Sequence, residues 1–107
     1  MRLLDESNNG QTIELAMGDT IEIVLPETRS TGFRWQTVTA PTPVCTVAVE
    51  TSEPPAAARP GAPGTHRWRL EAKKAGDCEL KLAYRRPWET SAHAAREFSI
   101  RIRVTSK

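Results

Sequence analysis

Three short stretches of the chain combine turn-forming residues with aromatic or cationic side chains. They lie at residues 29–35 (RSTGFRW), 61–64 (GAPG) and 85–89 (RRPWE). A turn requires glycine or proline for its backbone angles, but it does not require phenylalanine, tryptophan or paired arginines. Large aromatic and arginine side chains are the types that anchor protein–protein contacts. The chemistry that these stretches could perform is therefore noncovalent recognition of another protein.

Side chains in patterns typical of catalysis or metal binding are scarce. The sequence has no G-x-S-x-G or H-E-x-x-H motif and no carboxylate pair at a recognisable spacing. His66 and His93 are interpreted as surface residues rather than catalytic bases. Cys45 and Cys78 belong to no C-x-x-C pair, which does not favour a zinc site. We expect a protein that is not an enzyme, with no catalytic residue, no metal and no cofactor.

The two cysteines are predicted to be inaccessible. Cys45 has the parity of Val47 and Val49, and Cys78 has the parity of Leu80, so both are expected on the apolar sides of their strands. A free cysteine there behaves as a small hydrophobic residue. Two buried thiols are the favoured interpretation, and a disulfide between them is the alternative that export of the protein would favour.

The elements that must position the three stretches are β-strands. Apolar and polar residues alternate along most of the chain, which is typical of strands with one face on a core and one in water. No stretch shows a sustained helical period. We predict an all-β fold, an immunoglobulin-like antiparallel β-sandwich of about seven strands. The strands are predicted near residues 11–16, 19–25, 33–39, 44–50, 65–73, 78–85 and 96–104.

Length and charge restrict the class of protein. The 107 residues predict one domain over 1–107, and the net charge is +2 with 15 basic and 13 acidic residues interspersed. That balance predicts no nucleic-acid partner, and no apolar run approaches the ~20 residues of a membrane span. We expect a monomer. The first residues lack the apolar region of a signal peptide, so we expect a cytoplasmic protein, or a periplasmic or extracellular one if an upstream signal was removed.

Taken in order, the three stretches resemble the chagasin family of cysteine-peptidase inhibitors. Residues 30–35 match the second part of the family's Asn-Pro-Thr-Thr-Gly-aromatic-x-Trp loop, with Thr28 and Arg29 in place of Asn-Pro. Residues 61–64 match a Gly-x-Gly-Gly loop, with Pro63 in place of its middle glycine. Residues 86–88 match the Arg-Pro-Trp loop without change. The resemblance extends from about residue 12 to residue 104.

The resemblance implies a reversible inhibitor of papain-like cysteine peptidases that blocks the active-site cleft with three adjacent loops. In the family the first loop enters the cleft near the catalytic cysteine, and Thr31 matches its central threonine. The Arg-Pro-Trp loop packs on the primed side of the cleft, and the glycine loop covers the nonprimed side. The peptidase-binding residues are then Ser30, Thr31, Gly32, Phe33, Gly61, Ala62, Pro63, Gly64, Arg86, Pro87 and Trp88.

Without the resemblance, each stretch has a simpler interpretation. Residues 30–32 could be an ordinary loop whose hydroxyl groups cap their own backbone. Trp35 has the parity of a core residue, and Phe33 shares that parity and could be half-buried. Trp88 could fold back over the end of the sandwich, and residues 61–64 could be only a loop. The alternative functions are an immunoglobulin-like adhesion or envelope binding module and, more weakly, a structural domain of a longer chain.

Overall fold

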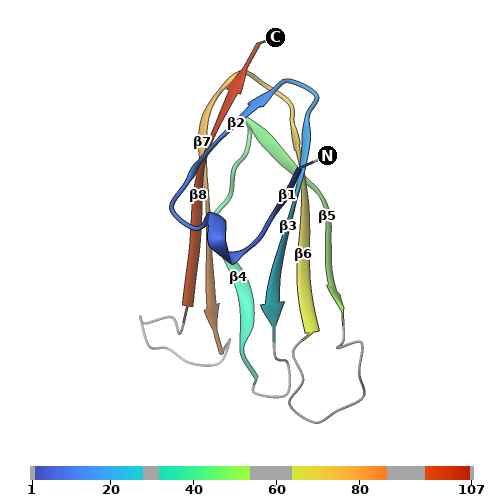
Figure 1. The fold of residues 1–107 in the computed structure, drawn as a ribbon, viewed down its shortest axis with the longest axis vertical. Coiled ribbons are helices and arrows are strands. Elements are labelled where there is room, and N and C mark those ends of the chain that lie inside the picture. The colour runs from blue at the N-terminus through green and yellow to red at the C-terminus, as the bar shows by residue number, and fades with distance from the viewer. Residues whose placement is uncertain (1, 28–31, 54–63, 87–95, 107) are drawn as a thin grey trace.

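The computed structural model describes residues 2–27, 32–53, 64–86 and 96–106, which form two β-sheets packed face to face (Figure 1). The first sheet has the order β1 (Arg2–Leu4), β3 (Thr20–Glu27), β6 (Gly64–Ala72), β5 (Cys45–Glu53). The second sheet has the order β2 (Thr12–Ala16), β8 (Arg96–Thr105), β7 (Gly76–Arg85), β4 (Arg34–Thr39). A 3-10 turn, η1 (Glu6–Asn8), follows β1 where the chain passes from the first sheet to the second.

The predicted all-β sandwich is confirmed, and each of the seven predicted strands is present. An eighth strand, β1, was not predicted because three residues are too few to show an alternating pattern, and only Leu4 of the three is buried. Four of the strand pairs are antiparallel, as predicted: β3–β6, β5–β6, β4–β7 and β7–β8. The pairs β1–β3 and β2–β8, each at one edge of its sheet, are instead parallel.

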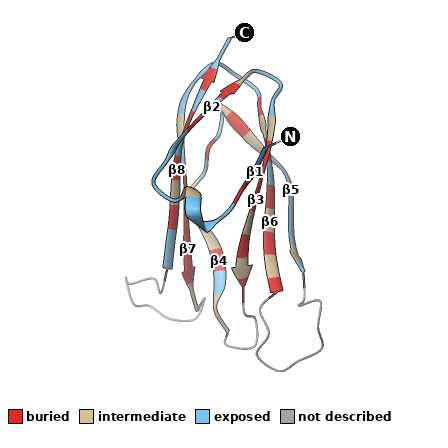
Figure 2. Cartoon of the chain, viewed as in Figure 1, coloured by how far each residue is buried: buried red, intermediate tan, exposed pale blue. Residues whose placement is uncertain are grey.

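The core lies between the two sheets and follows the alternation seen in the sequence (Figure 2). Leucine, isoleucine and aromatic side chains of both sheets form one buried cluster. Each large apolar side chain contributes roughly 1.5–3 kcal/mol by leaving water. Trp35 is 5% exposed, as its parity predicted, and packs edge-on against Trp68 with ring centroids 6.5 Å apart. The core therefore reaches close to the beginning of β4.

A β-bulge in β5 changes which side chains of this strand face the other sheet. The register with β6 shifts between Val47 and Val49: Val47 still lies opposite the buried Leu70, although it is 40% exposed on this edge strand, whereas Val49 lies opposite Arg69 and is 45% exposed, contrary to the parity prediction. Beyond the bulge, Glu50 lies opposite Trp68 and Ser52 lies opposite His66. Directly opposed residues of an antiparallel pair point to the same face. The bulge therefore turns Glu50 and Ser52 toward the inner face of the first sheet.

The two cysteines lie on different sheets, with their Sγ atoms 3.9 Å apart as free thiols. Cys45 is fully buried, as predicted, whereas Cys78 is only partly buried. Cys45 pairs with Ala72, the last residue of β6, so the thiols lie toward the end of the sandwich where β6 ends. Burial raises the pKa of both thiols, that of Cys78 to about 12. Both groups are therefore protonated at neutral pH.

Candidate functional site

Six strand termini gather at one end of the sandwich. Strands β3, β5 and β7 end there, and β4, β6 and β8 begin there (Figure 1). We call this the loop end, and it is bounded by Glu27, Arg34, Glu53, Gly64, Arg85 and Arg96. The connections β3–β4, β5–β6 and β7–β8 all leave from it. The three stretches singled out in the sequence fall in or beside these three connections, and the described strand ends that flank them lie at the same end.

Four of the predicted site residues lie in the described part of the chain. Gly32 has φ of +83°, in the left-handed region that favours glycine. Gly64 is the buried first residue of β6 and pairs with Glu27. Phe33 and Arg86 are partly exposed. The other predicted site residues lie outside the described residues: Ser30, Thr31, Gly61, Ala62, Pro63, Pro87 and Trp88.

Phe33 joins the first connection to the third. Its ring stacks on Tyr84 of β7 with centroids 5.4 Å apart, and the guanidinium carbon of Arg86 lies 4.6 Å from the centroid of the Phe33 ring. A cation–π contact of this kind contributes about 0.5–1 kcal/mol at an exposed site. Phe33 is half-buried, as its parity indicated. The two connections that carry Phe33 and Arg86 therefore touch at their bases.

Beneath the connections lies a buried polar cluster that the sequence did not reveal, formed around the carboxylate of Glu27. Glu27 is 1% exposed and accepts hydrogen bonds from the Trp35 amide (3.0 Å) and the Ser52 hydroxyl (2.6 Å). The His66 Nδ1 atom lies 2.9 Å from the same carboxylate, and its Nε2 atom lies 2.8 Å from Glu50. We call the groups of Glu27, Trp35, Glu50, Ser52 and His66 the loop-end polar cluster.

The expectation that His66 lies on the surface is wrong. Its side chain belongs to the inner face of β6, opposite Leu25, and the residue is 8% exposed. The imidazole lies flat on the indole of Trp68, with centroids 4.1 Å apart and planes 7° apart. The parity of His66 with Trp68 and Leu70 could have revealed this placement from the sequence.

Hydrogen bonding decides the charge of Glu27. Burial by itself would raise the pKa of this carboxyl group. The hydrogen bonds from His66, Ser52 and the Trp35 amide stabilise the charged form and outweigh burial, so the pKa of Glu27 lies below its ordinary value of 4.5. Glu27 is therefore a buried anion at neutral pH, and its hydrogen-bonding partners are what make that burial tolerable.

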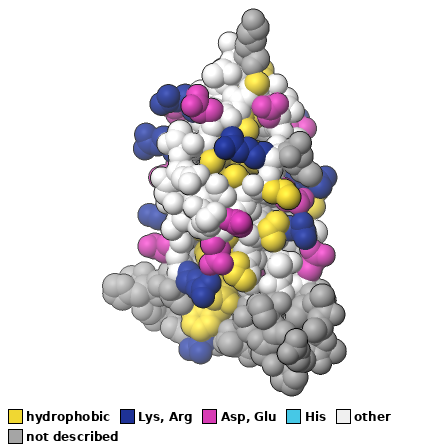
Figure 3. All heavy atoms as spheres, in the orientation of Figure 1, with side chains coloured by type: hydrophobic (Ala, Val, Ile, Leu, Met, Phe, Trp, Pro, Cys, Tyr) yellow, Lys and Arg dark blue, Asp and Glu magenta, His cyan; other side chains and the backbone are white. Residues whose placement is uncertain are grey.

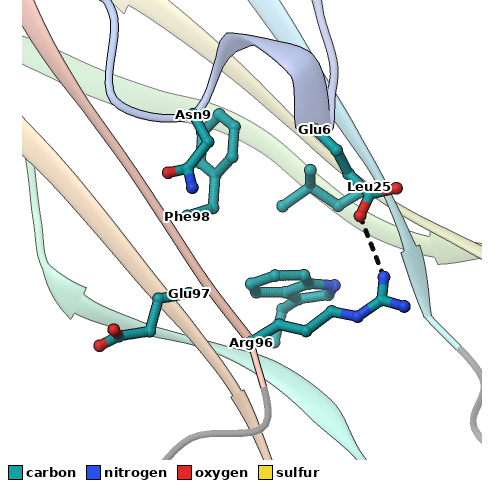
Figure 4. A pocket seen from close by; sticks show the side chains of 7 residues that line it. Glu6, Asn9, Leu25, Arg96, Glu97 and Phe98 are labelled. Atoms are coloured by element: carbon teal, nitrogen blue, oxygen red, sulfur yellow. Dashed lines mark hydrogen bonds and ion pairs between the residues drawn. The ribbon is translucent and has the colours of Figure 1, made fainter.

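A hollow of about 310 Å³ lies beside η1, between the two sheets (Figure 4). Its apolar lining consists of the core side chains Leu25, Trp35 and Phe98. Glu6 and Arg96 reach toward one another across it and form an ion pair of 3.0 Å. No described residue beside it belongs to the three sequence motifs except Trp35, which is a core residue.

The surface carries charges of both signs. Figure 3 shows lysine and arginine side chains interspersed with aspartate and glutamate over the visible face. The described residues include no helix long and apolar enough to cross a membrane.

Comparison with known proteins identifies relatives along nearly the whole chain. The model of the Chagasin family peptidase inhibitor I42 matches residues 14–102. Chagasin of Trypanosoma cruzi is 30% identical over 103 residues, which cover 92% of this chain and 94% of chagasin.

Solved structures agree with this match. The crystal structure of the cysteine protease inhibitor EhICP2 from Entamoeba histolytica superposes with a TM-score of 0.86 at 26% identity, covering 97% of this chain and 95% of EhICP2. PbICP-C, solved in complex with falcipain-2, has a TM-score of 0.63 at 19% identity over the whole of both chains, a likeness that shows the fold alone.

Proposed function

Because the chain belongs to the chagasin family of peptidase inhibitors, we propose that it inhibits papain-like cysteine peptidases reversibly, by placing the three connections of its loop end across the active-site cleft. The inhibitor is not itself an enzyme. The observation that supports the proposed mode of binding is that the described strand ends flanking the three sequence motifs lie at one end of the sandwich. The family favours this function over the adhesion or envelope binding module.

The three connections divide the cleft between them. Ser30, Thr31, Gly32 and Phe33 occupy the catalytic centre, where small side chains can enter a narrow site. Arg86, Pro87 and Trp88 contact the primed side, with Trp88 as a low-entropy aromatic anchor next to a rigid proline. Gly61, Ala62, Pro63 and Gly64 cover the nonprimed side. Contact on three sides corresponds to an interface of standard size, on the order of 1,600 Å² in total.

The backbone at the base of the first connection supports binding without cleavage. A peptidase cleaves a peptide that is held extended through its site. Gly32, at φ of +83°, departs from the extended conformation just before β4 begins. A chain that turns at this point meets the catalytic cysteine in a pose different from that of a substrate strand.

The Phe33–Arg86 contact supports the joint action of the first and third connections. Because Arg86 lies over the ring of Phe33, the two predicted contact regions are held beside one another before any partner arrives. Preorganisation of this kind lowers the entropy cost of binding. EhICP2, which is 26% identical, is a cysteine protease inhibitor, and the partner class proposed for this chain is the same.

Titration of papain tests the proposed function. Papain of known active-site concentration is mixed with increasing amounts of the protein, and residual activity is measured on a fluorogenic peptide. We expect a dose-dependent loss of activity that returns on dilution and that trypsin, a serine peptidase, does not show. Full papain activity in the presence of a large excess of the folded protein would overturn the proposal and favour the adhesion-module alternative.

A further inference from the structure

The loop-end polar cluster occupies positions where the rest of the sandwich is apolar. Glu27 continues the inward-facing series of Ile21, Ile23 and Leu25 along β3, and His66 begins the inward-facing series of β6. A buried ionised group is costly to desolvate, and apolar side chains of similar size stabilise a core at least as well. Stability alone therefore does not account for a carboxylate at the inner end of β3.

The hydrogen bonds of Glu27 join four strand ends across both sheets. The Trp35 amide belongs to β4 in the second sheet, whereas Ser52 and His66 belong to β5 and β6 in the first. Trp35 also donates its indole N–H to the carbonyl of Pro26, at 2.9 Å. The sheets are therefore tied together at this end by directional bonds as well as by packing.

These four strand ends are the bases of two of the predicted peptidase-binding connections. The first connection leaves directly after Glu27 and re-enters β4 one residue before Trp35. The second leaves β5 just beyond Ser52 and re-enters β6 two residues before His66. One carboxylate thus holds both bases of the first connection and both bases of the second. Hydrogen bonds are directional, so they fix relative position more tightly than apolar contacts do.

The partners of Glu27 are themselves held in place. His66 is stacked on Trp68, and its second ring nitrogen faces Glu50 at 2.8 Å. The β5 bulge turns Ser52 and Glu50 toward this site. The charged partner of His66 on β3 is Glu27 and that on β5 is Glu50.

We propose that Glu27 and His66 are positioning residues of the inhibitor, which set the relative placement of the first and second connections and thereby the affinity for the peptidase. This inference rests on the proposed function, because it assigns a role to groups that contact the binding connections and not the partner. These residues act before binding, by preorganisation. The cluster restricts the relative positions that the strand ends of the two connections can adopt, so less conformational entropy is lost when the peptidase binds.

Glu22 provides a matched control on the same strand. It is also buried, at 8% exposed against 1% for Glu27, and its carboxylate is bound by two β6 side chains, Arg67 at 2.8 Å and Arg69 at 3.2 Å. It pairs with Arg69 in the middle of β3. Glu22→Gln therefore removes a comparable buried charge from the same pair of strands, away from the loop end.

The test compares Glu27→Gln, His66→Gln and their double variant with Glu22→Gln, by melting curves and by inhibition constants against papain. We expect the melting temperature to fall for both glutamate variants. We expect the inhibition constant to rise about tenfold or more for Glu27→Gln and less than twofold for Glu22→Gln. The double variant should inhibit about as well as the worse single variant, because both changes disrupt one unit. Equal inhibition constants for Glu27→Gln and wild type would overturn the proposal.

Two further measurements keep the test decisive. If Glu27→Gln fails to fold, the milder Ser52→Ala removes one hydrogen bond to the same carboxylate and should raise the inhibition constant a few-fold; no change would count against the proposal. If the wild type itself does not inhibit, amide hydrogen exchange distinguishes failure of the proposed function from failure of the positioning role. Glu27→Gln should speed exchange at residues 32–35 and 64–66 at least tenfold relative to Glu22→Gln. Unchanged exchange there would overturn the positioning role irrespective of inhibition.

Discussion

The two ends of the sandwich are held together in different ways. At the end opposite the loop end, the turns are joined by backbone groups: the Gly18 amide donates to the Ala72 carbonyl at 2.8 Å, and the Ala72 amide donates to the Asp19 carbonyl at 2.9 Å. At the loop end, the strand ends are joined through the side chain of Glu27. Of the buried polar or charged residues in the described part of the chain (Glu22, Glu27 and His66), two lie at the loop end.

This difference indicates which end depends on residue identity. Backbone hydrogen bonds form with almost any side chain, so the opposite end is expected to tolerate substitution except at Gly18 and Gly76, whose positive φ angles favour glycine. Hydrogen bonds through Glu27 depend on one carboxylate and its partners, so the loop end is expected to be sensitive. If stability were the only requirement, backbone hydrogen bonds could join the strands at both ends of the sandwich. Burying a carboxylate costs desolvation free energy, so its presence at the loop end agrees with a functional requirement for fixed positions of the strand ends there.

Trp35→Ala should produce the largest effect, a loss of about 3–5 kcal/mol in the free energy of unfolding. The indole is 5% exposed, packs on Trp68 and Tyr84, and donates to Pro26, so its removal leaves both a cavity and an unpaired carbonyl. Urea unfolding of the variant and the wild type measures the loss. An unchanged midpoint would show that Trp35 does not support the base of the loop end.

A disulfide at the opposite end should stabilise the fold without altering inhibition. Oxidation by diamide, which takes up two electrons and two protons, would join the Sγ atoms of Cys45 and Cys78, now 3.9 Å apart. A cross-link that closes a loop of this size lowers the conformational entropy of the unfolded chain and stabilises the fold by about 4 kcal/mol. The raised pKa of both thiols makes the reaction slow near neutral pH.

Melting curves and papain inhibition before and after oxidation measure this effect, and Cys78→Ala, which cannot cross-link, is the control. A higher melting temperature with the same inhibition constant would sharpen the contrast between the ends. Weaker inhibition after cross-linking would show that the two ends are coupled, and the contrast would be lost.

Trp88→Ala and Thr31→Arg should each weaken inhibition strongly and leave the melting temperature unchanged. Truncation of an aromatic anchor typically costs ~2 kcal/mol or more, which is roughly thirtyfold in the inhibition constant. Thr31→Arg acts by steric exclusion, since it puts a long cation where a small side chain must enter. Lys74→Ala, at the opposite end, is the matched surface control and should inhibit like the wild type. Normal inhibition by Trp88→Ala would remove the third connection from the binding surface.

Acid should weaken the loop end through Glu27, and this is the smallest effect expected. The folded pKa of Glu27 lies below 4.5, so its stabilising contribution is fully present above pH 4.5 and is lost as the pH falls further, through the folded pKa. The difference in unfolding free energy between the wild type and Glu27→Gln should therefore shrink below pH 4.5. Urea unfolding at a series of pH values measures it, and a constant difference would contradict the assignment of Glu27 as a buried anion.

The strands could be predicted because alternation is a local property. Each central strand shows apolar residues at every second position, as β8 does from Phe98 to Val104. Features that interrupt the local pattern could not be predicted. Strand β1 is too short to alternate, and the bulge at Val47–Val49 reverses the faces of β5 without any change in composition.

The candidate site was predictable only in part for a related reason. The three motifs could be found because each is contiguous in the sequence. The loop-end polar cluster could not, because strand register alone brings together Glu27, Trp35, Ser52 and His66 from four strands. The interpretation of His66 as a surface residue followed its polar chemistry and neglected its parity with Trp68. Polar residues at inward-facing positions of a strand are the places where a functional constraint is expected.

The central claim is that the loop end, and not the opposite end, meets the peptidase. Amide NMR spectra of the isotope-labelled protein, recorded as papain with a methylated catalytic cysteine is added, test it most directly. The account predicts that the signals of residues 32–34, 64–66 and 85–86 shift or vanish, while those of residues 17–19 and 73–77 change only through the slower tumbling of the complex. Selective perturbation of residues 17–19 and 73–77, with the loop-end signals unaffected, would contradict it.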